Sequence, residues 1–390
     1  MSTLVNKLSK YSLVFYLFYL LWYKEIVGDV FVVLYGGAIL CTLLTFLTLH
    51  KNTLKVLHIP DMLKWQYIFG IYCLVTGFLV AKDIGILVKS LITYFSFLII
   101  CCLICINSNR TRNCKWLFNV LIGISVISCL CIMIIPYDYY NGIIVKTLGE
   151  HNNPNTLAVV MFAGIFSVLT KYNGSLKRLF ASVLLYIPFM YTIIQTGSKK
   201  GLLSGVLLFI IWLHIIRKYE GECASKIKKI TINILILFLV LGGISYFLYY
   251  FMDTASYQRL ELIFSSTSTL SRITYYDEAL DFFSDSPIVG IGFGQFILNS
   301  KLGRYSHSTY AEVIACTGII GTIIYFYPII KCGKDLWLKS RHNDYQSTML
   351  MVLYCIELLL GTTNIFMYDP IHMILWTILF YYSQKDKHVN

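Results

Sequence analysis

Residues 84–106 read IGILVKSLITYFSFLIICCLICI, and Lys89 is their only charged side chain. A helix rises about 1.5 Å per residue, so a run of this length crosses the roughly 30 Å hydrocarbon core of a bilayer. The whole chain of 390 residues shares this character: 57% of it is apolar, 13% is charged, and the mean hydropathy is +0.69. Such a composition excludes an ordinary water-soluble domain and a disordered chain.

Twelve apolar runs are long enough to be spans: 11–27, 30–49, 65–81, 84–106, 116–136, 154–170, 179–196, 201–216, 230–251, 308–330, 346–364 and 370–383. Because backbone polar groups in lipid must be paired within their own segment, these runs predict helices. We therefore expect an all-α polytopic membrane protein: a single integral membrane domain, residues 1–390, with about 12 transmembrane helices. The last run is short enough to be a re-entrant or tilted piece.

The basic residues predict an orientation for this bundle. Twenty-two of the 32 Lys and Arg residues fall in one set of alternate loops, nine fall in the other set, and Lys89 lies within a span. By the positive-inside rule the first set is cytoplasmic, so we expect both termini in the cytoplasm and an uncleaved first helix. The net charge of +12 is then a topology signal, and nucleic acid is not an expected partner. The 12 cysteines do not form a disulfide scaffold by this interpretation, because none lies in the long outer loop.

That long polar loop, residues 252–307, is the large extracytoplasmic loop of the prediction and is expected to contain short helices. Ser271 is a candidate N-cap for a helix over residues 272–283. Four apolar residues at helical spacing would form one face of that helix: Ile273, Tyr276, Leu280 and Phe283. Three acidic residues follow at steps of four: Asp277, Asp281 and Asp285. We expect them to form a solvated face rather than a metal site, because no histidine stands at ligand spacing.

Three outer segments carry turn signals, and the first of them lies inside this loop. Residues 285–294 read DSPIVGIGFG, in which the proline ends the helix and the glycines permit tight turns or close approach of the backbone to a ligand. A nucleotide site is rejected there, because the segment lies outside the cell and follows no strand. Residues 150–155, EHNNPN, place Asn152 or Asn153 near a helix cap and Pro154 at the helix start. Residues 196–201, TGSKKG, hold two lysines in an outer turn, where an anionic ligand would compensate for their charge.

These motifs, in this order, resemble the O-antigen ligase and polymerase family of bacterial polysaccharide enzymes. The resemblance covers about residues 150–330 and rests on five motifs: N-x-P-N-x-x-A at 152–158, T-G-S-K-K-G at 196–201, S-R-x-x-x-Y at 271–276, S-P-I-x-G-I-G-F-G at 286–294, and S-H-S-x-Y followed by G-I-I-G at 306–321. Two positions depart from the usual pattern. Lys199 stands where the family commonly has Arg, and Ser308 stands where Asn commonly follows the histidine.

The resemblance implies a catalytic region at residues 150–330 that transfers a glycan from a lipid diphosphate carrier, typically undecaprenyl diphosphate, at the outer leaflet of the bacterial cytoplasmic (inner) membrane. It implies no metal or nucleotide cofactor. The implied partners are the undecaprenyl-diphosphate-linked glycan and membrane lipids, together with a flippase and a chain-length regulator.

Chemistry of this kind needs cations, because breaking a sugar–diphosphate bond leaves negative charge on the departing phosphate. The candidates, in order of preference, are Arg272, then Lys199 or Lys200, then Arg259 or Arg304. Lys89 lies about six residues from the outer end of its span. It either snorkels to the interface or contacts the carrier phosphate.

The chemistry also needs a base to take the proton of the attacking sugar hydroxyl. His307, where the outer loop re-enters the membrane, is the preferred base, and His151 is the alternative. His372 has no partner motif and is expected to be structural. Residues expected to support the site are His151, Asn155, Gly292 and Glu312.

Two acidic residues lie within spans. Glu312 follows His307 by five residues on one helix, which is a poor offset for a direct pair, so a cation on another helix is its alternative partner. Glu357 is left without a role.

Three functions remain open at this point. We prefer a polymerase that joins lipid-linked oligosaccharide repeat units into a capsular or O-antigen-type polysaccharide. A ligase that transfers finished glycan to a lipid or protein acceptor would carry the same motifs. A polysaccharide flippase or other transporter is less well supported, because the sequence has no visible internal repeat and few charges at mid-membrane.

Overall fold

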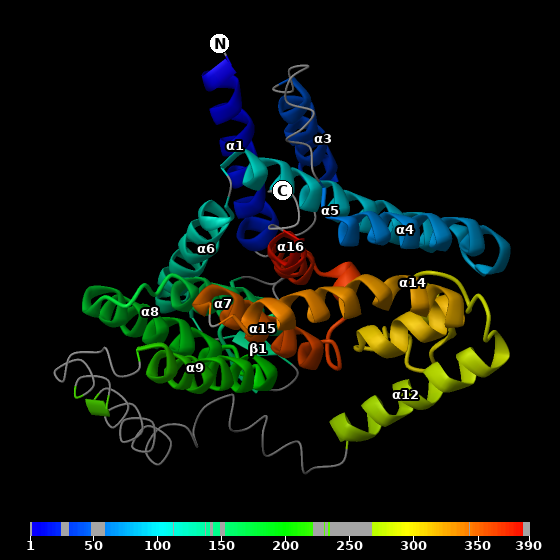
Figure 1. The fold of residues 1–390 in the computed structure, drawn as a ribbon. Coiled ribbons are helices and arrows are strands. Elements are labelled where there is room, and N and C mark those ends of the chain that lie inside the picture. The colour runs from blue at the N-terminus through cyan, green and yellow to red at the C-terminus, as the bar shows by residue number, and fades with distance from the viewer. Residues whose placement is uncertain are drawn as a thin grey trace.

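The computed structural model describes residues 2–24, 31–47, 59–111, 113–136, 138–140, 143–148, 153–220, 230, 233–234, 267–342 and 344–384. Figure 1 shows its helices. In chain order the elements are α1 (Ser2–Phe18) with the π-helical turn η1 (Tyr19–Tyr23), α3 (Phe31–Leu47), α4 (Asp61–Val80), α5 (Ile84–Thr111), α6 (Lys115–Ile134), β1 (Asp138–Tyr140), β2 (Ile143–Val145), α7 (Pro154–Thr170), α8 (Leu176–Gln195), α9 (Lys199–Glu220), α12 (Thr267–Asp285), α13 (Phe296–Asn299), α14 (Thr309–Ser340), α15 (Tyr345–Leu360), η4 (Phe366–Tyr368) and α16 (Pro370–Gln384).

Every predicted span that falls within the described residues is helical, while almost all of the span predicted at 230–251 lies outside them. Six helices of the described part are long and apolar enough to cross a membrane: α4, α5, α6, α8, α9 through Tyr219, and α14. Apolar side chains also cover the outside of the bundle, such as Phe15, Leu79 and Ile134, which are 74%, 80% and 85% exposed. Exposed apolar surface of this kind is typical of a protein surrounded by lipid.

The last helix lies at the centre of the bundle. Residues 371–384 of α16 are all buried, and Figure 1 shows the other helices arranged around it. With 15 residues, α16 is short for a span. The connection before it, residues 361–369, is partly buried, with Phe366 and Met367 in the core, and we call this segment the α15–α16 loop.

Connections between helices meet at one end of the bundle, which we call the α12 end. The β1–β2 hairpin, which the sequence did not predict, continues into Lys146, whose N–H donates to Gln195 O at 3.0 Å. Between α4 and α5, the Asp83 N–H donates to Gln295 Oε1 at 3.0 Å, and Gln295 Nε2 donates back to Asp83 O at 2.9 Å. The charge pattern predicts that this end faces the outside of the cell.

Helix α12 differs from its prediction in extent and in the face that it buries. It begins at Thr267 and ends at Asp285, so Ser271 lies inside the helix and the prediction of a cap there is wrong. The predicted apolar face is largely exposed: Ile273, Tyr276 and Leu280 are 52%, 41% and 59% accessible.

A different face of α12 packs on the bundle. Tyr275 and Ala279 are buried in one cluster with Ala311 and Ala315 of α14, whose small side chains let the two helices approach closely. The buried Glu278 accepts hydrogen bonds from Ser300 Oγ and the Lys301 N–H, at 2.8 and 2.9 Å. As the sequence predicts, the acidic residues at 277, 281 and 285 are exposed.

The glycines after α12 allow close contact between two backbones. The Ile291 N–H donates to Ala315 O at 3.0 Å and the Ile319 N–H donates to Pro287 O at 2.8 Å, so the segment lies along a kink in α14. The kink is at Gly318, with φ of 61°, and a Cβ there would lie 2.5 Å from the Ile288 backbone. A Cβ on Gly290, with φ of 73°, would likewise lie 2.4 Å from backbone atoms of Cys316. Only glycine permits both the positive φ and this spacing.

Candidate functional site

Two of the sequence motifs meet where α7 and α9 begin. Asn153 caps α7 and Pro154 follows it, as the sequence predicts. Ser198, in the turn before α9, donates its hydroxyl hydrogen to Asn155 Oδ1 at 2.9 Å. A Cβ on Gly201 would lie 2.6 Å from the Ala158 Cβ, so glycine is needed for this approach of the two helices. The N-x-P-N-x-x-A and T-G-S-K-K-G motifs therefore form one unit.

Lys200 connects this unit to the α15–α16 loop. Its ammonium donates to Asn364 Oδ1, and it also donates to Thr363 O at 3.3 Å. Both of these acceptors are neutral oxygens, and they orient the ammonium. The neighbouring Lys199, the first residue of α9, is half-buried.

The same loop holds the start of α14. Ser308 is the N-cap, and its hydroxyl accepts from the Ala311 N–H at 3.4 Å. The Thr309 N–H is shared between Gly361 O and Asn364 O, both at 2.8 Å, and its hydroxyl donates to Asn364 O at 2.6 Å. These bonds anchor the helix that follows His307 to the loop that binds Lys200.

Helix α12 reaches this loop as well. The Tyr276 hydroxyl donates to Thr362 O at 3.0 Å. Tyr275 places its ring edge-to-face with the imidazole of His307, with 5.7 Å between the ring centroids. The α15–α16 loop therefore joins segments of three of the motifs: the α9 turn, α12 and the start of α14.

His307 has an unusual backbone. Its φ is +56°, the only positive value at a non-glycine position among the described residues. Positive φ is uncommon for residues with a side chain, although histidine tolerates it better than most. Glu312 helps to hold this turn, because Oε2 of its fully buried carboxylate accepts from the Ser306 N–H at 3.1 Å. Within the part of the chain that the structure describes, the carboxylate of Glu312 also accepts from Cys316 Sγ, at 3.8 Å.

Tyr305 is another ionisable group near His307. Burial raises the pKa of the Tyr305 phenol above its ordinary value, and the nearby carboxylate of Glu312 raises this pKa further. The phenol therefore stays protonated at neutral pH, which makes Tyr305 a poor general base.

Beneath Asn364 lies a fully buried pair of ionisable side chains. Glu357 of α15 and His372 of α16 are both 0% exposed, and Nδ1 of His372 lies 2.8 Å from Oε2 of Glu357. On the other side of the imidazole, Nε2 lies 2.9 Å from Nδ2 of Asn364. The sequence did not predict this contact. Its only signal was that Glu357 and His372 are ionisable residues within neighbouring apolar runs.

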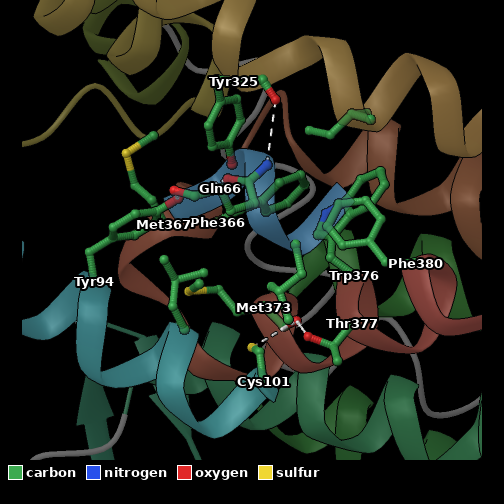
Figure 2. A pocket seen from close by; sticks show the side chains of 13 residues that line it. Gln66, Tyr94, Cys101, Tyr325, Phe366, Met367, Met373, Trp376, Thr377 and Phe380 are labelled. Atoms are coloured by element: carbon green, nitrogen blue, oxygen red, sulfur yellow. Dashed lines mark hydrogen bonds between the residues drawn. The ribbon is translucent and has the colours of Figure 1, made fainter. Parts of the chain in front are cut away.

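A small cavity lies near this pair but does not form part of the site. It measures about 30 Å³, and Gln66, Tyr94, Phe366 and Met373 are among its lining residues (Figure 2). The volume suffices for a water molecule but not for a sugar or a prenyl chain. It is therefore not a substrate site.

The other predicted residues are spread over the α12 end. Asn155 forms the contact with Ser198 described above, and Gly292 (φ 104°) is buried, with its N–H donating to Cys316 O at 3.0 Å. Arg304 is exposed in the turn before His307, and Lys89 is exposed on α5.

His151 and Arg259 lie outside the described residues, as does the side chain of Arg272. Arg272 itself lies on α12, one helical turn before Tyr275 and Tyr276.

Comparison with known proteins agrees with the motifs. A sequence profile of the family described as O-Antigen ligase matches residues 181–326, which run from α8 to the middle of α14. A search of curated proteins gave no match. Residues 181–326 of this helical membrane protein therefore match the O-antigen ligase family, in agreement with the resemblance of its motifs.

Proposed function

We propose that this protein is a polymerase that joins undecaprenyl-diphosphate-linked oligosaccharide repeat units at the outer face of the bacterial cytoplasmic membrane. The observation that carries the proposal is the meeting of Lys200, α12 and the start of α14 at the α15–α16 loop. A cation for the carrier diphosphate and an imidazole for the acceptor hydroxyl are thereby brought to one end of the bundle.

In the proposed reaction, the hydroxyl oxygen of the acceptor sugar attacks the anomeric carbon of the donor glycan. The bond from that carbon to the diphosphate oxygen breaks, and its electron pair leaves with the carrier diphosphate. His307 accepts the hydroxyl proton. Lys200 and Arg272 stabilise the charge that develops on the departing phosphate, which is the role of fixed cations at such a site.

Lys200 is preferred over Lys199 because its ammonium is oriented by two acceptors of the α15–α16 loop. Further contacts to the diphosphate are assigned to Lys199, Arg259, Arg304 and Lys89. Asn155, Gly292 and Glu312 support the site by fixing its backbone segments, and His151 keeps the supporting role that the sequence predicts. A flippase that delivers the donor and a chain-length regulator are the proposed protein partners.

The orientation belongs to the same proposal. The basic residues are concentrated in the loops opposite the α12 end, so the positive-inside rule places that end outside the cell. There the donor glycan, already on the outer leaflet, can enter the site from the lipid phase.

A ligase is the second candidate, and the description of the matched family favours it. The two functions are separated by incubating purified protein with synthetic undecaprenyl-diphosphate-linked repeat units and analysing chain length on a gel. A polymerase gives a ladder from this substrate alone. A ligase gives product only after a separate lipid or protein acceptor is added. Failure to release carrier diphosphate under either condition would contradict glycan transfer altogether and favour transport.

A further inference from the structure

Four side chains form a continuous hydrogen-bond network from the interior of the bundle to the α12 end. It runs from Glu357 through His372 and Asn364 to Lys200. The residues come from α15, α16, the α15–α16 loop and α9. Three of the four lie outside the region that matches the O-antigen ligase family, so the motifs do not account for them.

The donors and acceptors of these four side chains allow one arrangement of hydrogen bonds in this network. The ammonium of Lys200 has only donors, so Asn364 must turn its carbonyl oxygen toward Lys200. The amide NH₂ of Asn364 then points at Nε2 of His372, which must accept. A histidine that accepts at Nε2 carries its proton on Nδ1, and this proton is donated to the carboxylate of Glu357.

Each link depends on the one before it. The carboxylate of Glu357 selects the histidine tautomer, the tautomer selects the orientation of the amide, and the amide presents an oxygen to the ammonium. A proton on Nε2 of His372 would face the NH₂ group of Asn364. The amide would then have to turn, which places its NH₂ group against the ammonium of Lys200.

The burial of Glu357 and His372 indicates that their contact has a role. Both members of the Glu357–His372 pair are 0% exposed, and burying a carboxylate is costly unless its oxygens are satisfied. Within the described part of the chain, Oε1 of Glu357 has no hydrogen-bond partner. The carboxylate of Glu357 therefore depends on the hydrogen bond between its Oε2 and His372. The ring of Phe366 covers the imidazole, with 4.7 Å between the ring centroids.

We propose that Glu357 and His372 are positioning residues that act through Asn364 to hold the ammonium of Lys200 where the carrier diphosphate binds. This inference rests on the proposed function, in which Lys200 is a diphosphate-binding cation. The side-chain oxygen of Asn364 accepts from Lys200, while its backbone carbonyl accepts from the N–H and the hydroxyl of Thr309, at the start of the helix that follows His307. The buried pair therefore sets the orientation of the Asn364 amide and, through it, the position of the Lys200 ammonium.

The test is a double-mutant cycle in which the affinity for the carrier diphosphate is measured. Full-length purified protein is titrated with undecaprenyl diphosphate that carries no glycan, so that binding is measured without chemistry. Glu357→Gln and Asn364→Leu are each made in the wild-type and the Lys200→Met background. In the wild-type background each is expected to weaken binding roughly tenfold, because a charge-assisted contact to the diphosphate loses its alignment. In the Lys200→Met background neither should weaken binding further.

Two comparisons make the cycle decisive. Thr377→Val changes an equally buried residue of α16, whose hydroxyl donates to Met373 O, and it should leave binding unchanged. Asn364 is only half-buried, so Asn364→Leu provides the answer if Glu357→Gln fails to fold, as judged by thermal unfolding.

The outcomes separate this inference from the proposed function. If Lys200→Met weakens binding but Glu357→Gln and Asn364→Leu do not, the positioning role is overturned and the role of Lys200 stands. If the two variants weaken binding equally in both backgrounds, they act on the fold and not through Lys200, which also overturns the inference. If Lys200→Met binds like the wild type, both the inference and the assignment of Lys200 are wrong.

Discussion

Replacing His307 by alanine is expected to lower the rate of glycan transfer by about 10²- to 10⁴-fold, which is the usual contribution of a general base. The sugar hydroxyl is a poor nucleophile until its proton is removed, and Tyr305, the nearby phenol, is a poor substitute because its pKa is raised by burial. His307 is exposed, so the loss should not arise from a change in core packing. The measurement is the initial rate of product formation at saturating donor, together with the amount of protein inserted in the membrane.

The backbone at position 307 requires a second variant. Its φ of +56° is strained for alanine, whereas asparagine adopts this region readily. His307→Asn therefore removes the imidazole with less strain and should lose as much activity as His307→Ala. His342, an exposed histidine just after the opposite end of α14, is the matched control, and His342→Ala should retain wild-type activity. Normal turnover in both variants at position 307 would remove His307 from the mechanism.

Replacing Arg272 by alanine is expected to reduce transfer by about 10²- to 10³-fold, the effect of removing one group that stabilises developing negative charge. Arg272 lies one turn before Tyr275, which contacts His307, and Tyr276, which bonds to Thr362 of the α15–α16 loop. Arg272→Lys should recover part of the rate, because lysine keeps the charge but lacks the planar pair of donors that binds a phosphate in two places. Turnover is measured with the same assay as for His307.

The control for Arg272 is an exposed arginine far from the site. Arg341 is the C-cap of α14 and lies at the end opposite the α12 end, so Arg341→Ala should transfer glycan at the normal rate. An Arg272→Ala protein with full activity would show that the carrier diphosphate is not stabilised from α12.

The spans and the helix starts could be predicted from the sequence because their causes are local. Apolar runs of sufficient length predict helices wherever lipid leaves no other way to satisfy the backbone. Asn153 with Pro154 marks a helix start by its own chemistry, and the structure confirms the cap. The sequence did not predict that the N-x-P-N-x-x-A and T-G-S-K-K-G motifs lie together, and the Asn155–Ser198 hydrogen bond shows that they do.

Contacts between distant segments could not be predicted in the same way. The apolar residues of α12 suggested one buried face, but the shape of α14 selects another, because only its alanines allow Tyr275 and Ala279 to approach. The glycines at 290 and 318 looked like features of a loop and of a helix, yet each is required by the backbone of the other segment. Periodicity within one segment carries no information about such a partner.

The network beneath the site was hidden for the same reason. Glu357 and His372 are 15 positions apart in different helices, so neither residue had a visible partner in the sequence. Asn364 stands in a short polar run, GTTN, between two apolar segments, and that interruption was the available signal. Ionisable residues inside apolar runs are rare enough that each predicts a role, but only the packing of α15 against α16 shows which residues pair.

The central claim is that one end of the bundle holds the carrier diphosphate beside Lys200 while His307 faces the acceptor sugar. An experimental structure with a non-reactive analogue of the lipid-linked donor tests it most directly. We predict that the diphosphate lies within hydrogen-bond distance of Lys200 and Arg272, with the anomeric carbon on the side of His307. The account would be contradicted by density for the diphosphate at the opposite end of the bundle. Density too far from Lys200 and Arg272 for either side chain to contact it would contradict the account as well.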